Sequence, residues 1–316
     1  MPLFINLLIL ILGLALLAVS SDFLVKTSVK LAFLLKLSTL FVGLIFVAFG
    51  TSFPEASVSI VAIIKQYKDI ALGNIIGSNI ANIGLVLGLS CIIRPLKVDS
   101  SLFKREIPLM LISCILFFIL CLDSQISRLE GIILIFLFVF FCIFSYRGSK
   151  SHKESQDFEL KGFLKRTKSK LLISGLFITS LILLVLSSNL LVNSGVNLAR
   201  YFGISNWIIA MTVFAVGTSL PELGASIAAS FKKVSSISIG NVVGSNIFNI
   251  LFVLGLASLI RPIQVNQGIL KFELPALLIF SLILLIVLRI KYRISRWEGL
   301  ILFAGYIGFI ILLIAK

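Results

Sequence analysis

The sequence has very few of the residue types that usually build metal centres and acid–base catalysts. His152 is its only histidine and lies in a polar segment, and its four cysteines form no CxxC pair. Cys91, Cys114, Cys121 and Cys142 all lie in apolar runs, where free cysteine behaves as a small buried hydrophobe. These scarcities argue against zinc, copper or iron as the preferred ion. They also argue against a serine hydrolase, which needs a base beside its nucleophile.

Charge is also scarce, because only 13% of the 316 residues are charged whereas 59% are hydrophobic. Soluble proteins contain about 45–50% apolar residues, and the mean hydropathy of +1.15 is that of an integral membrane protein. A membrane-spanning helix needs roughly 20 apolar residues. The sequence contains ten such runs, at residues 3–20, 39–64, 70–93, 107–122, 129–146, 171–192, 206–231, 235–260, 272–288 and 298–315.

The formal charge of +15 would indicate nucleic acid as a partner for a soluble protein, but here the basic residues lie between the apolar runs. In membrane proteins such residues set orientation, because cytoplasmic loops are enriched in Lys and Arg. With both termini outside, the inward-facing connections carry 21 Lys and Arg and the outward-facing ones carry seven. We therefore expect outside termini, a cytoplasmic linker at 147–170 and no nucleic-acid partner.

The chain is an internal duplication. Adding 167 to a position in the first half finds its counterpart, so that GTSFPE at Gly50 returns as GTSLPE at Gly217 and GNIIGSN returns as GNVVGSN. Each half, 1–146 and 171–316, carries five predicted spans, and an odd number makes the second half enter from the opposite side. The sequence thus predicts an all-α integral membrane protein of ten transmembrane helices. They would form two inverted five-helix repeats with discontinuous helices at a central ion site, as in many secondary transporters.

Glu55 and Glu222 are the unusual residues of the duplicated segment. Of thirteen acids, only these two fall deep within apolar runs, and each follows a proline. An ionised acid at the bilayer centre costs roughly 2.5–3.5 kcal/mol or more, so such residues tend to be functional. Each proline removes a helical hydrogen bond, and Pro54 is expected to break its span near Ala48–Ser52. The motif cores contain no Lys or Arg, so the compensating positive charge must come from solution.

The neighbouring residues supply the oxygen ligands that a hard cation prefers. Calcium takes six to eight oxygens, whereas magnesium gives up its water reluctantly. Hydroxyls on Ser and Thr that bond back to their own helix are the structural alternative, and the glycines serve close packing equally well. The candidate oxygens are the two carboxylates, the hydroxyls of Thr51, Ser52, Thr218 and Ser219, the amides of Asn82 and Asn249, and carbonyls freed by Pro54 and Pro221.

The paired words GTSFPE with GNIIGSNIAN and GTSLPE with GNVVGSNIFN resemble the two alpha-repeats of the calcium/cation antiporter superfamily. The chain is most similar to short prokaryotic members of its sodium/calcium exchanger family. The resemblance implies that Glu55 and Glu222 bind calcium and share sodium, with carbonyls of Thr51 and Thr218 on calcium. It further implies that Asn82 and Asn249 line the middle, and that the flanking sodium sites are formed by Ser52, Ser78, Ser219, Ser245 and the carbonyls of Ala48 and Ala215.

The resemblance implies a calcium-for-sodium antiporter of a bacterial inner membrane that works by alternating access, with no enzymatic activity and no cofactor. The lipid bilayer, calcium and sodium are the expected partners, and a monomer is the expected unit. Some relatives have an aspartate at the position of Asn249, and the amide here argues against potassium co-transport. A proton-driven calcium or sodium antiporter is the main alternative. A cation channel and an intramembrane hydrolase are the alternative hypotheses from other functional classes.

Overall fold

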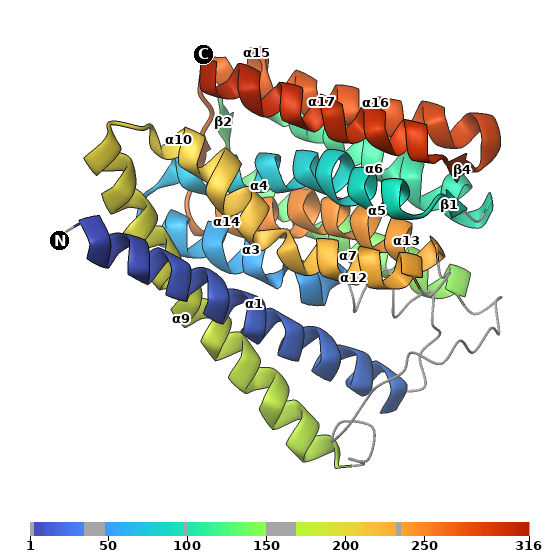
Figure 1. Ribbon diagram of the computed structural model, residues 1–316, viewed down its shortest axis with the longest axis horizontal. Helices are drawn as coiled ribbons and strands as arrows, with labels where there is room; N and C mark the ends of the chain where they lie inside the picture. The colour runs from blue at the N-terminus through green and yellow to red at the C-terminus, as the bar shows by residue number, and fades with distance from the viewer. Residues whose placement is uncertain (1–2, 35–47, 98–99, 150–168, 232–234, 316) are drawn as a thin grey trace.

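The computed structural model describes residues 3–34, 48–97, 100–149, 169–231 and 235–315, and these form a bundle of helices (Figure 1). His152, most of the predicted linker 147–170 and the first part of the predicted span 39–64 lie outside the described residues.

The described residues of the first half form helices and two short strands. Its elements are α1 (Leu3–Leu34), α3 (Ala48–Ile64), α4 (Lys68–Ala81), the π-helical η2 (Asn82–Leu87), α5 (Gly88–Ile93), β1 (Leu96–Lys97), α6 (Ser100–Leu120), β2 (Gln125–Ile126) and α7 (Arg128–Ser149).

The second half repeats this order with more breaks. Its elements are α9 (Lys170–Phe202), α10 (Asn206–Ile209), η3 (Ala210–Phe214), α11 (Ala215–Thr218), α12 (Leu220–Phe231), α13 (Ser235–Ile247), η4 (Phe248–Leu254), α14 (Gly255–Ile260), β3 (Ile263–Gln264), α15 (Gln267–Lys271), α16 (Glu273–Lys291), β4 (Arg293–Ile294) and α17 (Arg296–Ala315).

Eight helices within the described residues are long and apolar enough to cross a membrane. The two other predicted spans correspond to α3, which is shorter over its described residues, and to α6, which carries Lys104, Arg105 and Glu106 near its start. The structure is thus that of a multi-pass membrane protein.

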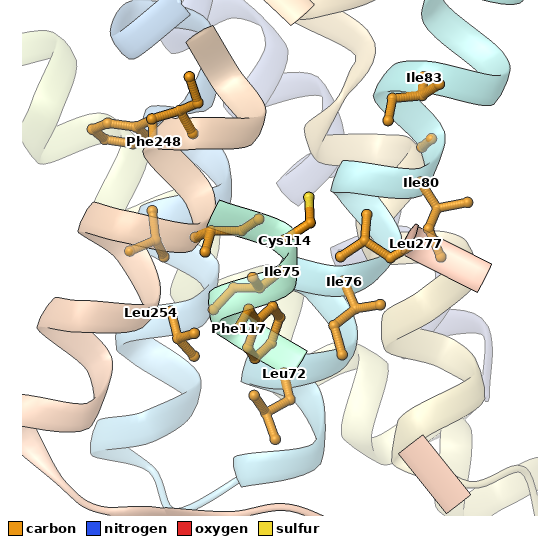
Figure 2. Packing of buried hydrophobic residues seen from close by; sticks show 14 of the residues in the cluster. Leu72, Ile75, Ile76, Ile80, Ile83, Cys114, Phe117, Phe248, Leu254 and Leu277 are labelled. Carbon is orange, nitrogen blue, oxygen red and sulfur yellow. The ribbon is translucent and has the colours of Figure 1, made fainter. Parts of the chain in front are cut away.

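The two most buried of the eight candidate spans carry the motifs GNIIGSN and GNVVGSN. The α4–α5 span is 83% buried and the α13–α14 span 78% buried, against 22% for the apolar window of α1. Small residues make this possible: a Cβ added at Gly73 would lie 2.8 Å from the Cβ of Ala210, and one at Gly77 would lie 2.7 Å from that of Ala215. On another face of α4, Ile75 and Ile76 pack in the core beside Phe117 (Figure 2). The polar motifs therefore lie at the centre of the protein.

Helices α1 and α9 lie side by side at the edge of the bundle, slanting away from the other helices (Figure 1). The sequence predicts that the first span continues past Asp22 as one long helix, and α1 does so, with 32 residues. The outward faces of the pair are apolar, with Phe4 76% and Leu171 85% exposed. Such faces suit contact with lipid.

The two halves interlock. Helix α7 of the first half packs on α14 of the second, and α17 of the second packs on α5 of the first. Short antiparallel strands repeat the exchange, because β1 pairs with β4 and β2 pairs with β3. Each half therefore completes the packing of the other.

The predicted break at the first proline is wrong for the described residues, because Pro54 lies inside α3 and does not end it. Membrane helices tolerate proline when neighbouring groups satisfy the freed carbonyl. The second half does contain the break: α11 ends at Thr218, and α12 begins at Leu220 after Ser219, whose ψ of 3° is not helical. Pro221 then sits in the first turn of α12, where its missing N–H costs little.

The contact between α17 and α5 should be sensitive to one methyl group. A Cβ at Gly299 would lie 2.6 Å from the Cβ of Cys91 and 2.9 Å from the carbonyl oxygen of Gly88. We expect Gly299→Ala to destabilise the protein by about 1–3 kcal/mol, measured as thermal unfolding in detergent. Gly308→Ala on the same helix is the control, because its Cβ would meet no atom within 4 Å. Equal melting of the two variants would contradict this account of the packing.

Candidate ion-binding site

Glu55 and Glu222 both lie fully buried, with 0% exposure, in the middle of the bundle. Each carboxylate accepts a hydrogen bond from a serine of the opposite half. Ser52 donates to Oε1 of Glu222 at 2.8 Å, and Ser219 donates to Oε1 of Glu55 at 3.3 Å. Neither glutamate faces the lipid, and the two carboxyl groups interact electrostatically with each other.

Neither carboxylate has a Lys or Arg partner among the residues that the structure describes. The second oxygen of each, Oε2, is buried and accepts no hydrogen bond. A buried carboxylate without a positive partner is expensive. The arrangement therefore calls for a cation or a proton from solution.

The threonines of the two motifs tie the halves together through two asparagines. The hydroxyl of Thr51 donates to Oδ1 of Asn241 at 3.1 Å, and that of Thr218 donates to Oδ1 of Asn74 at 3.3 Å. Asn241 and Asn74 in turn donate to the backbone carbonyls of the glutamates, at 3.4 Å to Glu222 and 3.1 Å to Glu55. Each asparagine thereby fixes the backbone on which a glutamate stands.

Sequence reasoning missed these two asparagines as site residues. Asn74 and Asn241 are the first asparagines of GNIIGSN and GNVVGSN, so the duplicated motif already marked them. Both are 0% exposed and also donate to a serine one turn after the glutamate, Ser59 or Ser226. Their role is to hold the glutamate segments in place.

The remaining hydroxyls and carbonyls lie in the same networks. Ser245 donates to Oε1 of Glu222 and to the carbonyl of Ala48, both at 3.4 Å, and Ser78 shares a hydrogen bond with Thr218 at 3.2 Å. Thr51 and Thr218 also bond back to the carbonyls of Ala48 and Ala215, at 3.2 and 3.4 Å. The threonine hydroxyls thus combine back-bonding with contacts between halves.

Two matching networks result, and each contains residues of both halves. One joins Glu222, Ser52, Ser245, Ala48, Thr51 and Asn241. The other joins Glu55, Ser219, Ser78, Ala215, Thr218 and Asn74.

Asn82 and Asn249 lie one helical turn beyond Ser78 and Ser245, at the starts of the π-helical segments η2 and η4. Single π-helical turns are frequent at functional sites. Asn82 donates to Oδ1 of Asn246 at 3.0 Å. The amide oxygens of Asn82 and Asn249 are buried and have no hydrogen-bond partner. Together with the two Oε2 atoms they make four buried acceptor oxygens of the kind that bind hard cations.

The geometry can be compared with known proteins. A sequence profile of the family described as "Sodium/calcium exchanger protein" matches residues 5–147 and 172–315. The chain belongs to this sodium/calcium exchanger family. The two matched segments fall on the two halves of the chain, and the family resemblance of the duplicated motifs is confirmed.

Several relatives align with nearly the whole chain. The sodium/calcium exchanger MaX1 of Methanosarcina acetivorans is 35% identical, covering 98% of each sequence. The inner membrane protein YrbG of Escherichia coli is 35% identical, covering 96% of this chain and 95% of its own. A solved structure of the sodium-calcium exchanger NCX_Mj, soaked with 2.5 mM Na⁺ and 10 mM Sr²⁺, is 32% identical with a TM-score of 0.72. It covers 100% of this chain and 99% of its own.

Asn74 and Asn241 should contribute to stability, because each holds the backbone of a glutamate. Asn241→Ala removes the buried amide that accepts from the Thr51 hydroxyl and donates to the Glu222 carbonyl, and we expect a loss of about 1–3 kcal/mol in stability. Thermal unfolding in detergent measures it. Asn189→Ala is the control, since Asn189 is partly exposed and, within the described residues, its side chain donates to the carbonyl of Val185 in its own helix. If both variants unfold at the same temperature as the wild type, Asn241 does not stabilise the backbone at Glu222.

Proposed function

We propose that this chain is a secondary antiporter that exchanges calcium for sodium across a membrane by alternating access. The observation that carries the proposal is the pair of buried glutamates. Among the residues that the structure describes, neither has a basic partner, and each has an oxygen that accepts no hydrogen bond. The relative MaX1 is named a sodium/calcium exchanger, and NCX_Mj is a sodium-calcium exchanger whose structures were soaked with Na⁺, Ca²⁺ or Sr²⁺.

We propose that ten spans form two inverted five-helix repeats. Contacts between counterparts support a two-fold relation: Asn246 donates to the carbonyl of its counterpart Asn79 at 3.2 Å, and Cys114 lies 3.4 Å from its counterpart Ser281. Residues that contact their own equivalents lie beside a two-fold axis. With five spans in each half, the two halves have opposite orientations in the membrane.

The proposed calcium ligands are the carboxylates of Glu55 and Glu222 and the carbonyls of Thr51 and Thr218. We propose that the amide oxygens of Asn82 and Asn249, which are buried and have no hydrogen-bond partner among the described residues, line the same space. Sodium would use the glutamates together with the flanking hydroxyls and carbonyls, those of Ser52, Ser78, Ser219, Ser245, Ala48 and Ala215. Their placement in two matching networks supports this division.

Coupling follows from electrostatics. Two fixed negative charges in a low-dielectric interior make reorientation of the ion-free protein costly, whereas a loaded site is close to neutral. The protein therefore changes its exposed face mainly when it carries calcium or sodium. An ion bound on one side is then released on the other only in exchange for another.

The proposed setting is a bacterial inner membrane, in line with the relative YrbG, named an inner membrane protein. The excess of Lys and Arg supports outside termini, a cytoplasmic linker at 147–170 and halves at 1–146 and 171–316. We propose a monomer as the working unit. The sodium/calcium exchangers among the relatives favour sodium over protons as the coupling ion.

A flux assay tests the coupling ion directly. Purified protein in liposomes loaded with sodium should take up calcium when diluted into sodium-free buffer, and the rate should fall when the sodium gradient is removed. Collapsing a pH gradient at constant sodium should leave uptake unchanged. Calcium uptake that is indifferent to sodium would overturn the proposal, and uptake driven by a pH gradient without sodium would establish proton coupling instead.

The site assignment has its own test. Glu55→Gln and Glu222→Gln each keep the side-chain size but remove one negative charge, and we expect each to lower calcium uptake by at least about 100-fold. Asp123→Asn is the matched control, because Asp123 is an exposed acid between α6 and β2. All three variants should purify and melt like folded protein. Transport at the wild-type rate by both glutamine variants would defeat the assignment.

A further inference from the structure

The two strand pairs are equivalent structures at opposite ends of the bundle. We call β1 with β4 the inner clasp and β2 with β3 the outer clasp, because the proposed orientation puts the first at the cytoplasmic side of the membrane and the second at the outer side. Figure 1 shows β1 and β4 together at one end and β2 at the other. Both clasps have a buried apolar face, with Leu96 opposite Ile294 in the inner clasp and Ile126 opposite Ile263 in the outer one. Packing of the two clasps is therefore alike.

The exposed faces of the clasps differ. In the inner clasp Lys97 lies directly opposite Arg293, whereas in the outer clasp Gln125 lies opposite Gln264. In the duplicated sequence Gln264 is the counterpart of Lys97 at the offset of 167. Gln125 is the counterpart of Arg293 at an offset of 168, because the register slips by one residue near Arg128, which matches Arg296. Like charges directly opposite each other on paired strands are destabilising. Since the outer clasp forms with neutral residues, the fold does not require the two cations.

The surroundings of the inner clasp are basic. Residues 94–106 and 289–298 carry eight Lys or Arg and three Asp or Glu. The equivalent segments 261–273 and 121–130 carry three of each. Within the described residues, neither Lys97 nor Arg293 has an ion-pair partner, and both side chains are exposed. The repulsion between them is therefore not offset by an acid of the described chain.

Aromatic side chains place the inner clasp at the height of the lipid headgroups. Tyr292 and Trp297 flank β4 and are 41% and 76% exposed. Tyr and Trp are enriched at both membrane–water interfaces, where their amphipathic rings lie at the level of the headgroups. Arg296, next to Trp297 in the sequence, is exposed and donates to the carbonyl of Ile93 at 3.4 Å. The exposed cations of the clasp thus project where headgroup phosphates lie.

We propose that the inner clasp binds the phosphate of an anionic phospholipid headgroup, with Lys97 and Arg293 as its two charged ligands. The phosphate offsets the repulsion between the paired cations, and Arg supplies directed donors to phosphate oxygens. A cluster of Lys and Arg at the cytoplasmic end of membrane helices attracts anionic lipids. This site lies apart from the buried glutamates, and the inference does not depend on the proposed transport function.

Native mass spectrometry of the detergent-purified full chain tests the inference, with phosphatidylglycerol as the probe and phosphatidylcholine as the neutral comparison. The variant Lys97→Gln with Arg293→Gln gives the inner clasp the residues of the outer one, so we expect it to fold. Loss of two interfacial cations should weaken phosphatidylglycerol binding by about 25-fold. Phosphatidylcholine binding should not change.

The control variant carries Arg128→Gln and Arg261→Gln, which remove two cations next to the outer clasp, and should bind phosphatidylglycerol like the wild type. Equal weakening in both double variants would mean that only total charge matters, and unchanged binding in both would mean that the inner cations only orient the chain. Either result overturns the proposal. Displacement of phosphatidylglycerol by an equal concentration of inorganic phosphate would also overturn it, because the site would then recognise free phosphate.

Discussion

The structure depends on two negative charges held where the described part of the chain provides no positive partner. Glu55 and Glu222 are completely buried, and each uses one carboxylate oxygen for a serine of the other half while the other oxygen accepts nothing. If the purpose were stability alone, apolar side chains of similar volume would serve at least as well. The cost of burying the pair is acceptable when mobile cations supply the missing charge.

Interlocking of the halves follows from the same requirement. A site with two acids from two repeats needs both repeats to hold them rigidly, and here every network draws residues from both. Asn74 positions the backbone of Glu55 while accepting a hydrogen bond from Thr218 of the other half, and Asn241 does the converse with Thr51. The exchanged packing of α7 on α14 and of α17 on α5 surrounds this centre with scaffold that belongs to both repeats.

Much of the site was predictable because a polar motif in an apolar chain is conspicuous and this one occurs twice. The glutamates and the flanking hydroxyls were predicted in that way, and the structure brings them into two hydrogen-bonded networks. Their role as ion ligands stays a prediction. Asn74 and Asn241 were missed because a buried amide next to glycines fits simple packing as well as it fits a site. The effect of Pro54 was misjudged because a rule about one helix omits the neighbours that satisfy its carbonyls. The hydrogen-bond partner of each carboxylate, amide and hydroxyl oxygen depends on contacts between distant segments, which the sequence alone does not reveal.

A duplicated fold also contains its own control. Positions that are identical in both halves, such as the GTS and GSN words, are what the common architecture and the site need. Where counterparts differ, the fold tolerates either residue. The cause of such a difference is then sought in the surroundings of each residue, not in the common fold. Helix α3 is continuous through its GTS motif, whereas the helix of the second half breaks at Ser219. The common fold therefore accepts two backbone conformations at the same motif. Lys97 and Arg293 against two glutamines show the same freedom at the membrane surface. Because a fully buried pair of branched apolar side chains lies beneath each clasp, the environment of the exposed faces is what distinguishes the charged clasp from the neutral one.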